Sequence, residues 1–455
     1  MILPQNLDLD FDTIAFIHNS HKNIIMNISV IGTGYVGLPA GAGLAKHGHQ
    51  VTCVDIDEDK VEKINNGECP IFEKGLPELL EEVVSEGKLE ATTDTKTAVK
   101  NADIVLLAVG TPMDEEGNIN LDYIKQASED VAEGMKERNG YQTIVVKSTV
   151  VPGTTENEVI PILEQSGKKA GEDFGICMNP EFLREGTALN DFLEPDRIVI
   201  GELDEKSGEQ LEKMYSNFNA PIMRTGLKEA ELIKYASNSI LATKISFINE
   251  VGNLCKELGI DVYEVADGVG MDHRVNRDFL DSGAGFGGSC FPKDVRALIK
   301  FMEENKVEPK ILQSVIDVNV DQKTKLVEQL EQHYPDLTDK KVAVLGLSFK
   351  PGTDDIRKSP AIPIIQELKD KGAKVKAYDP KAIENMKQKH PDIQYTSNYK
   401  EALENTDAGL IITDWPEFNS ISRKDLKTMN RPLLLEGRRM EYDIKGENRE
   451  GITWP

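Results

Sequence analysis

The chain contains few of the residues from which disulfide frameworks and metal centres are built. Its 455 residues include only five cysteines and seven histidines. The cysteines are odd in number and show neither paired nor metal-type spacing; they are Cys53, Cys69, Cys177, Cys255 and Cys290. We therefore expect thiols in a reducing compartment, and no metal site.

Long hydrophobic runs are missing as well. No segment approaches the ~20 apolar residues that a membrane-spanning helix needs. The first 25 residues lack the basic start and the apolar core of a signal peptide. These absences predict a cytoplasmic protein without a membrane partner. Residues 1–25 precede Met26 and the first clear strand, so we expect them to be a disordered, dispensable extension.

Positive charge is also in short supply. The chain has 53 basic and 78 acidic residues, a net charge of −25. Such a charge repels phosphate backbones and anionic lipids, which argues against nucleic acid and membranes as partners. A hydrophobic content of 39% is typical of a globular protein, and this length predicts two or three domains.

Short apolar runs alternate with helical segments in the first half of the chain. The runs have the length of buried strands and lie at 27–32, 50–55, 103–109, 142–147, 174–178 and 198–200. Strands that alternate with helices in this way form a parallel, doubly wound sheet.

A helical region follows. Apolar residues recur at helical spacing from Thr225 to about Leu258, which predicts a long amphipathic helix. More helix is expected over residues 294–332.

A second strand-and-helix unit begins after this region. Strands are expected at 341–346 and 373–379, and the segment 405–416 repeats the pattern of 101–112. The predicted fold class is α/β, with two doubly wound, Rossmann-like domains joined by a long central helix.

A glycine fingerprint follows the first expected strand. Gly32 permits a tight turn, Gly34 lets the backbone approach a pyrophosphate, and Gly37 lets the helix pack closely on the strand. Asp55 ends the next strand, where a carboxylate binds ribose hydroxyls and repels the 2′-phosphate of NADP. This order of elements predicts NAD binding.

A thiol stands in the glycine-rich loop from Gly283 to Asp294. The ammonium of Lys293, three residues after Cys290, favours the nucleophilic thiolate. The alternative is a buried cysteine at a loop corner. The other motifs of the chain favour the nucleophile.

Polar residues also follow expected strands, at the edge where doubly wound sheets bind ligands. Thr111 and Thr149 follow two strands, and Glu181 and Glu185 follow a third. Ordinary loop residues and surface acids are the alternatives, and the NAD fingerprint favours ligand contacts.

Cations and an amide are placed in a similar way. Lys234 and Asn238 are four residues apart on the long helix and therefore share a face, which lines either a cleft or solvent. Lys350, Arg357 and the pair Arg438–Arg439 follow strands of the second unit. These cations could bind the phosphates of a second nucleotide. The alternative is that they are ordinary surface residues.

These motifs, in this order, resemble those of the nucleotide-sugar dehydrogenases, the UDP-glucose/GDP-mannose dehydrogenase family. The resemblance covers Asn27 to about Asp443. Besides the fingerprint and the Lys234/Asn238 helix, it rests on Asn179-Pro-Glu-Phe-Leu-Arg-Glu, Gly285-Phe-Gly-Gly-Ser-Cys-Phe-Pro-Lys-Asp294 and Phe349-Lys350. It implies an NAD-binding domain over 26–224, a central helical dimerisation domain over 225–335 and a UDP-sugar-binding domain over 336–455.

The resemblance also implies three sets of site residues. The catalytic set is Cys290 as nucleophile, Lys234 and Asp294 for protons and the hydrolytic water, and Glu181, Asn238 and Thr149. The NAD set is Gly32, Thr33, Gly34, Tyr35, Val36, Gly37, Asp55, Lys60, Thr111, Thr149, Glu185, Lys293 and Arg357. The substrate set is Glu181, Phe182, Leu183, Arg184, Glu185, Lys234, Asn238, Arg274, Asp281, Gly285, Phe286, Gly287, Phe349, Lys350 and Arg438, with Arg439 as an alternative to Arg438.

The implied activity is the four-electron oxidation of UDP-glucose to UDP-glucuronate by two NAD, through a cysteine thiohemiacetal and thioester. The same chemistry on GDP-mannose or a UDP-N-acetylhexosamine is the alternative, and a non-catalytic nucleotide-sugar sensor is a third possibility. Arg274 corresponds to a family arginine that reaches into the partner subunit's site, which implies a homodimer or a higher homo-oligomer.

Overall fold

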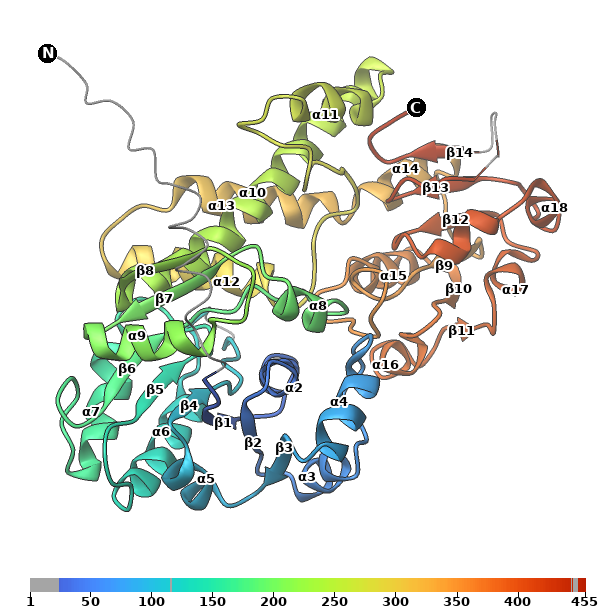
Figure 1. Ribbon diagram of the computed structural model, residues 1–455. Helices are drawn as coiled ribbons and strands as arrows, with labels where there is room; N and C mark the ends of the chain where they lie inside the picture. Colours follow the sequence, from blue (N-terminus) through green and yellow to red (C-terminus); the bar gives the residue numbers. More distant parts are fainter. Residues whose placement is uncertain (1–23, 115–116, 443, 445–448) are drawn as a thin grey trace, which may run out of the picture. The chain divides into compact units, whose positions relative to one another are not determined.

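The computed structural model describes residues 24–114, 117–442, 444 and 449–455, and these fall into two compact units (Figure 1). The first contains the described residues up to Thr111 together with Asn120–Lys234, and the second contains the described residues of Pro112–Ile119 and Tyr235–Pro455. The boundary lies within helix α10 (Leu227–Leu258). The expected extension, residues 1–25, lies outside the described residues except for its last two positions.

The first unit is built on an eight-stranded sheet. Its strands are β1 (Asn27–Ile31), β2 (Gln50–Val54), β3 (Leu89–Thr92), β4 (Ile104–Leu107), β5 (Thr143–Val146), β6 (Gly175–Met178), β7 (Ile198–Glu202) and β8 (Ile222–Gly226). Their order is β3-β2-β1-β4-β5-β6-β7-β8. The chain reverses its direction of winding between β1 and β4, and such a switch point opens a ligand-binding crevice at the carboxyl ends of the strands.

The expectation of a wholly parallel sheet is wrong at one pair of strands. Neighbours from β3 to β6 run parallel, but β6 and β7 are antiparallel, and β8 is parallel to β7. Only twenty residues or so separate the two strands, and they hold a loop and one short helix rather than a full crossover helix. Strands β3 and β8 had not been expected, since neither forms a continuous apolar run.

Helices cover both faces of this sheet (Figure 1). They are α2 (Gly37–Lys46), α3 (Glu58–Asn65), α4 (Leu76–Ser85), α5 (Thr95–Asn101), α6 (Asp122–Met135), α7 (Ile160–Leu163), α8 (Ala188–Leu193) and α9 (Glu205–Met214). Side chains alternate along each strand, so Val30 packs into one buried cluster with Leu44 of α2, and Ile31 packs into another with Val131 of α6. Burial on both faces explains the continuous apolar strands.

The second unit has a six-stranded, all-parallel sheet of order β11-β10-β9-β12-β13-β14. The strands are β9 (Lys341–Leu345), β10 (Lys374–Tyr378), β11 (Gln394–Tyr395), β12 (Ala408–Ile411), β13 (Leu434–Glu436) and β14 (Arg449–Gly451). Its helices are α14 (Lys325–His333), α15 (Ala361–Asp370), α16 (Ile383–Lys387), α17 (Tyr399–Leu403) and α18 (Arg423–Leu426). Strand β12 lies in the segment that repeats the pattern of β4.

Between the two sheets the chain is helical, as expected. Helix α10 is 32 residues long and begins two residues later than the sequence indicated. It is followed by α11 (Val262–Gly270), α12 (Phe291–Glu304) and α13 (Lys310–Gln322). Within the described residues, none of the helices combines the length and the apolar character needed to cross a membrane.

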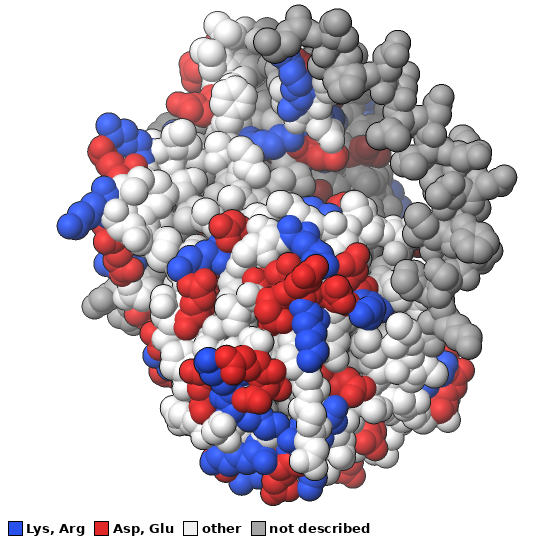
Figure 2. All heavy atoms as spheres, turned by 60° about the vertical axis from the view of Figure 1, so that its left-hand side comes forward, with Lys and Arg blue, Asp and Glu red and all other residues white. Residues whose placement is uncertain are grey.

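Charged side chains of both signs are interspersed over the surface. Figure 2 shows acidic and basic groups side by side on one face. Many form ion pairs, such as Lys100 with Glu137 at 2.9 Å and Arg224 with Glu202 at 2.8 Å. On the described part of this face, the basic side chains do not form a continuous stripe of the kind that follows a nucleic-acid backbone.

Candidate active site

The three fingerprint glycines of the first unit meet different surroundings. A Cβ on Gly32 would lie 2.8 Å from the Ala108 carbonyl oxygen, and one on Gly37 would lie 1.9 Å from the Gly32 oxygen. These two glycines are therefore required by the protein's own packing. Gly34 is exposed and has no other atom within 4 Å of such a Cβ, which leaves the space that a pyrophosphate needs.

Asp55 follows β2 and holds the turn that follows β1. One carboxylate oxygen accepts hydrogen bonds from Thr33 N at 3.0 Å and Thr33 Oγ1 at 2.5 Å, and Lys60 Nζ lies 3.7 Å away. Burial disfavours the charged form, but the hydrogen bonds from Thr33 and Asp57 and the Lys60 charge outweigh it and hold the pKa of Asp55 below its ordinary value. The residue is thus a partly exposed carboxylate, as ribose binding requires.

The loops after β4 and β5 are tied together. Thr111 Oγ1 donates a hydrogen bond to the Thr149 carbonyl oxygen at 2.7 Å, and Ser148 Oγ donates to the Val109 oxygen at 2.7 Å. Both threonines therefore lie at the carboxyl edge of the sheet, beside the switch point.

A buried ion pair joins the loop after β6 to helix α10. Lys234 Nζ lies 2.9 Å from Glu181 Oε1, and the two side chains are 3% and 7% exposed. The other Glu181 oxygen accepts a hydrogen bond from Leu183 N at 2.6 Å. Burial alone would raise the pKa of Glu181, but the Lys234 charge and hydrogen bond, with smaller contributions from Leu183 and Lys147, lower it below its ordinary value.

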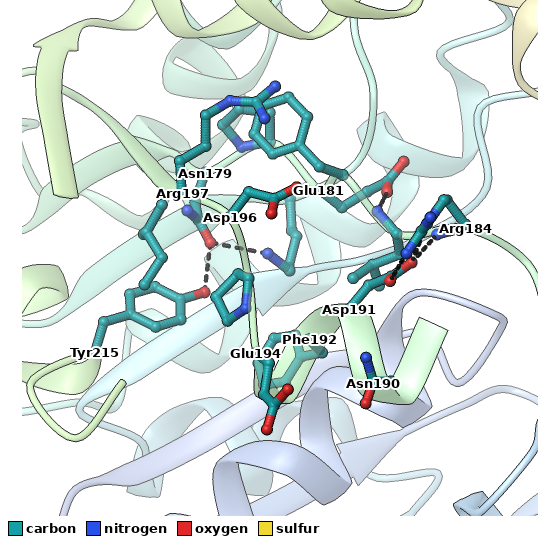
Figure 3. Close-up of a pocket in the computed structure, with 16 residues that line it drawn as sticks. Asn179, Glu181, Arg184, Asn190, Asp191, Phe192, Glu194, Asp196, Arg197 and Tyr215 are labelled. Carbon is teal, nitrogen blue, oxygen red and sulfur yellow. Dashed lines mark hydrogen bonds and ion pairs between the residues drawn. The ribbon is translucent and has the colours of Figure 1, made fainter. Parts of the chain in front are cut away.

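A second buried lysine stands near this pair and was missed by the sequence analysis. Lys147 Nζ donates to Asn179 Oδ1 at 2.9 Å, and Tyr215 Oη donates to the same oxygen at 2.6 Å (Figure 3). Lys147 and Glu181 both line a pocket of about 250 Å³. The sequence feature that could have pointed to this residue is a lysine at the end of an otherwise apolar strand.

Two predicted substrate residues in this loop already have partners within the unit. The Phe182 ring lies beneath the Arg197 guanidinium, 3.9 Å from its centroid. Arg184 makes a two-pronged ion pair with Asp191, at 3.1 and 2.6 Å (Figure 3). Arg184 would have to leave Asp191, or share it, in order to bind an anion.

Cys290 occupies an exposed position in the second unit, immediately before helix α12. Its sulfur lies 3.6 Å from Ser289 Oγ. Cys53 and Cys177 are buried, which raises the pKa of each to about 12. The idea that Cys290 is a buried packing residue is therefore wrong. Its thiol is accessible, at a helix end whose N–H groups favour a negative charge.

A buried carboxylate lies one turn further along α12. Asp294 is 1% exposed and accepts hydrogen bonds from Asn238 Nδ2 at 2.5 Å and Lys293 Nζ at 2.7 Å. Three predicted site residues, Asn238, Lys293 and Asp294, thus form one network in the second unit. Lys293, expected to contact NAD, has Asp294 as its partner here.

The glycines before Cys290 are needed for packing against the protein itself. Gly285 has φ +91°, and a Cβ there would lie 2.7 Å from Asn319 Oδ1. A Cβ on Gly287 would lie 2.5 Å from the Lys358 carbonyl oxygen. Phe286 is fixed by two hydrogen bonds with Asn319, at 2.7 and 3.1 Å. The loop is therefore rigidly placed.

A pocket of about 490 Å³ lies at the carboxyl edge of the second sheet. Its lining includes Phe349, Lys350, Asp281, Arg438 and Arg439. Arg438 donates to the Asp281 and Gly285 carbonyl oxygens at 3.2 and 3.3 Å. Of the two candidate arginines, Arg438 is thus the one attached to the loop that leads to the thiol.

Arg439 has a different environment. It pairs with Asp261 at 2.6 Å and lies 4.0 Å from the Tyr263 ring centroid and 4.9 Å from that of Trp454. The guanidinium is therefore committed to packing. This favours Arg438 for ligand contact.

Comparison with known proteins identifies the family. Family models of the UDP-glucose/GDP-mannose dehydrogenase family match residues 26–219 (NAD binding domain), 228–321 (central domain) and 343–441 (UDP binding domain). The chain belongs to this family. Its two Rossmann-like units therefore have different nucleotides to bind, NAD in the first and UDP in the second.

Individual members of the UDP-glucose/GDP-mannose dehydrogenase family cover nearly the whole chain. The UDP-glucose 6-dehydrogenase AglM of Haloferax volcanii is 44% identical over 94% of this chain and 100% of its own length. The solved UDP-glucose dehydrogenase of Pyrobaculum islandicum is 39% identical with a TM-score of 0.89, covering 95% and 99% of the two chains. The UDP-D-ManNAc dehydrogenase of Pyrococcus horikoshii is 29% identical with a TM-score of 0.83, covering 94% and 99%.

Two further predicted contacts of this dehydrogenase, Arg357 and Arg274, are exposed, whereas Tyr35, Val36, Leu183 and Glu185 are half-buried. Arg357 pairs with Asp355 at 2.7 Å, and Arg274 is exposed and pairs with Asp272 at 2.5 Å. In the described residues, no cluster of three or more His, Cys, Asp or Glu side chains has the arrangement of a metal site.

Proposed function

We propose that the protein oxidises UDP-glucose to UDP-glucuronate, using two NAD and a covalent intermediate on Cys290. Membership of the family makes the chain an NAD-dependent dehydrogenase of a nucleotide sugar. The observation that carries the covalent step is the exposed Cys290 thiol at the start of α12, one turn from the buried Asp294 network. A simple alcohol dehydrogenase has no use for such a thiol.

The reaction needs a nucleophile between two oxidations. NAD, when bound, supplies the hydride acceptor for each of them. In the first, the primary alcohol of the sugar loses a hydride and a proton and becomes an aldehyde. The Cys290 thiolate then adds to the carbonyl carbon, and loss of a second hydride from this thiohemiacetal gives a thioester. Water hydrolyses the thioester, which releases the carboxylate and returns the thiol.

Proton transfer falls to the buried charged groups. Lys234, held by Glu181 at 2.9 Å, accepts the hydroxyl proton and then stabilises the oxyanion that develops at the same carbon. Asn238, on the same helix four residues later, adds a hydrogen-bond donor. Asp294 orders the hydrolytic water, and Thr149 lies beside the NAD site.

The nucleotide end of the substrate is assigned to the second unit. Lys350 and Arg438 supply cations for the diphosphate, and the Phe349 ring supplies an apolar surface in the same pocket. The other predicted contacts are Phe182, Leu183, Arg184, Glu185, Asp281, Gly285, Phe286 and Gly287. The choice of UDP-glucose is supported by 44% and 39% identity to the two UDP-glucose enzymes, against 29% for the UDP-D-ManNAc enzyme.

A second copy of the chain is the proposed partner of α10. Ile240, Phe247 and Leu254 are spaced seven residues apart, on one face of the helix, and are 58%, 53% and 59% exposed. A stripe of large exposed apolar side chains is typical of a subunit interface. In such a dimer, the family resemblance implies that Arg274 of one subunit contributes to the site of its partner. A cytoplasmic location fits the use of NAD and a catalytic thiol.

The substrate assignment is tested by comparing nucleotide sugars at saturating NAD. We expect kcat/KM for UDP-glucose to exceed that for UDP-N-acetylmannosamine by ~10⁴-fold or more, because a site built to bond a hydroxyl rejects an analogue that lacks it. The value for GDP-mannose should also be well below that for UDP-glucose. If either competitor ranked first, the substrate assignment would be wrong, while the four-electron chemistry would still stand.

A further inference from the structure

Lys147 is a buried charged group for which the mechanism above has no role. It follows β5, is 4% exposed, and donates its hydrogen bond to the amide oxygen of Asn179 rather than to a carboxylate. The ammonium also lies 5.8 Å from the Phe192 ring centroid. Burying an ammonium is costly, so a lysine kept here needs a reason beyond packing.

The amide that receives Lys147 is held in one orientation. Asn179 Nδ2 donates to the Val199 carbonyl oxygen at 2.8 Å, so the two donors, Lys147 and Tyr215, meet its Oδ1. Burial raises the pKa of Tyr215, which keeps its hydroxyl protonated and able to donate. Lys147 is therefore fixed in position beside Glu181, which lines the same pocket.

Lys147, Glu181 and Lys234 together place two cations around one carboxylate. The Glu181 carboxylate pairs directly with Lys234 and feels the charge of Lys147 as well. The pKa of Lys147 is lowered to about 8, mainly by burial and in smaller part by the Lys234 charge, while the Glu181 charge acts in the opposite direction. One proton of this cluster is thus weakly held, and in a coupled cluster that proton belongs to both lysines.

Two lysines and one carboxylate leave an excess of one positive charge, and the other charged groups around the pocket do not neutralise it. Arg184 and Asp191 pair with each other, and Arg197 lies over Phe182. The remaining acids of the lining are Glu194 and Asp196, and both side chains are exposed to solvent, which screens their charge. The pair of buried lysines is therefore left to share Glu181.

We propose that Lys147 is a positioning residue of the oxidation, which shares the Glu181 carboxylate with Lys234 and thereby makes it easier for Lys234 to accept and release a proton during turnover. The inference rests on the proposed roles of Lys234 and Glu181. If Lys147 were absent, Glu181 and Lys234 would form a balanced pair, and Lys234 would hold its proton more tightly. A purely structural lysine would have no such effect.

The test is the pH dependence of kcat/KM with UDP-glucose. We expect the wild-type value to rise with pH, with a midpoint set by the proton that the two lysines share. In Lys147→Met the midpoint should move up by about one pH unit or more, with a roughly tenfold lower kcat/KM at pH 7. Lys147→Arg retains the second cation, so its midpoint should stay at or below that of the wild type.

Controls separate the possible failures. Lys168→Met changes a half-buried lysine of the same unit that bonds the Arg138 carbonyl oxygen, and it should leave the profile unchanged. Lys234→Met should remove the rising limb. If that limb persists, the proposed role of Lys234 is wrong; if it disappears but Lys147→Met leaves the wild-type midpoint in place, the inference about Lys147 is wrong. Should Lys147→Met not fold, the arginine variant decides, because an upward shift in its midpoint contradicts the proposal.

Discussion

The two Rossmann-like units use the same structural position in opposite ways. In each, a carboxylate after the second strand accepts hydrogen bonds from the backbone of the turn after the first strand. Asp55 does so for Thr33, and Asp379 does so for Leu347 and Ser348, at 2.7 and 3.0 Å. Asp55 keeps part of its surface exposed, whereas Asp379 is 1% exposed.

Asp379 has no capacity left for a ligand. It also accepts from Trp415 Nε1 at 2.9 Å and from the backbone N–H groups of Lys381 and Ala382, each at 2.8 Å. The position that in the first unit is predicted to bind a ribose is part of the core in the second. The comparison shows that the fold supplies the position, while the neighbouring residues decide between binding and stability.

The turn after the first strand also differs between the two units: it is open in the first unit and filled by side chains in the second. Gly34 is exposed, but the corresponding residue two positions after Gly346 is Ser348, which is buried and bonds Asp379. The third glycine of the fingerprint, Gly37, is replaced by Pro351. The second unit thus lacks the open turn for a pyrophosphate, and it places the side chains of Lys350 and Arg438 in its pocket instead.

The largest expected effect separates chemistry from cofactor binding. Cys290→Ala should lower the rate of UDP-glucuronate formation by ~10³-fold or more, because the covalent step has no other thiol. NAD binding to the first unit and the unfolding midpoint should stay close to the wild-type values, since Cys290 is exposed. Product analysis by chromatography, with NAD titration as the control, measures both. A variant with normal product formation would rule out the covalent mechanism.

Removing the two carboxylates one at a time gives the next largest effect, and the two losses should differ in kind. Asp379→Ala should lower the free energy of unfolding by about 3 kcal/mol, because several buried donors lose their acceptor. Asp55→Ala should cost about 1 kcal/mol in stability but weaken NAD binding by ~10- to 100-fold. Urea unfolding and NAD titration of both variants test this. Equal stability losses would mean that the two sites are used alike.

The two neighbouring arginines of the second unit should also differ. Arg438→Ala should raise the KM for UDP-glucose by ~10-fold or more with little change in stability, because a diphosphate contact is lost. Arg439→Ala should instead lower stability by ~1 kcal/mol, because the ion pair with Asp261 and the stacking on Tyr263 disappear. If only Arg439→Ala raised the KM, Arg439 would be the residue that binds the diphosphate, and Arg438 would not.

The smallest expected effect concerns a lysine of the second unit that resembles Lys147. Burial and the nearby cations Lys358 and Arg296 lower the pKa of Lys323 to about 8. An unfolded lysine titrates near 10.4, so the unfolded chain binds more protons between these values and stability rises with pH from about 8 to 10. Lys323→Met should therefore stabilise the protein by ~1 kcal/mol at pH 7, with the gain fading above pH 8.

The matched comparison is Lys147→Met, measured by urea unfolding over the same pH range. Glu181 partly compensates the charge of Lys147, whereas the nearby charges that act on Lys323, besides its burial, are cations. The stabilisation should therefore be smaller for Lys147→Met. If the free energies of unfolding of Lys323→Met and the wild type differed by the same amount at every pH, the charge of Lys323 would not be what destabilises the folded protein.

The sequence predicted the elements whose signals are local. The strands β1, β2, β4 and β5 were found because both of their faces are largely buried and most of their residues are apolar. The fingerprint was found because only glycine fits at Gly32 and Gly37. The direction of β7 depends on long-range packing and was not predictable in this way. The three-domain division of residues 26–455 and the individual site roles remain predictions.

Within the site, the sequence indicated residue types but not their partners. The network of Asp294 with Asn238 and the pairing of Arg184 with Asp191 depend on side-chain positions. Lys147 was missed because one polar residue at the end of a strand carries no pattern. Asp379 was seen to end a strand, but its many hydrogen bonds, and hence its structural role, could be read only from the fold.

The stoichiometry of NADH released per UDP-glucose consumed tests the central claim most directly. We expect a ratio of two, with UDP-glucuronate as the product, because the thiohemiacetal on Cys290 undergoes a second oxidation before hydrolysis. The measurement needs a limiting amount of UDP-glucose, excess NAD, absorbance at the NADH band and chromatographic assay of the acid. A ratio of one, with an aldehyde as the product, would contradict the four-electron mechanism and leave Cys290 without a role in the reaction.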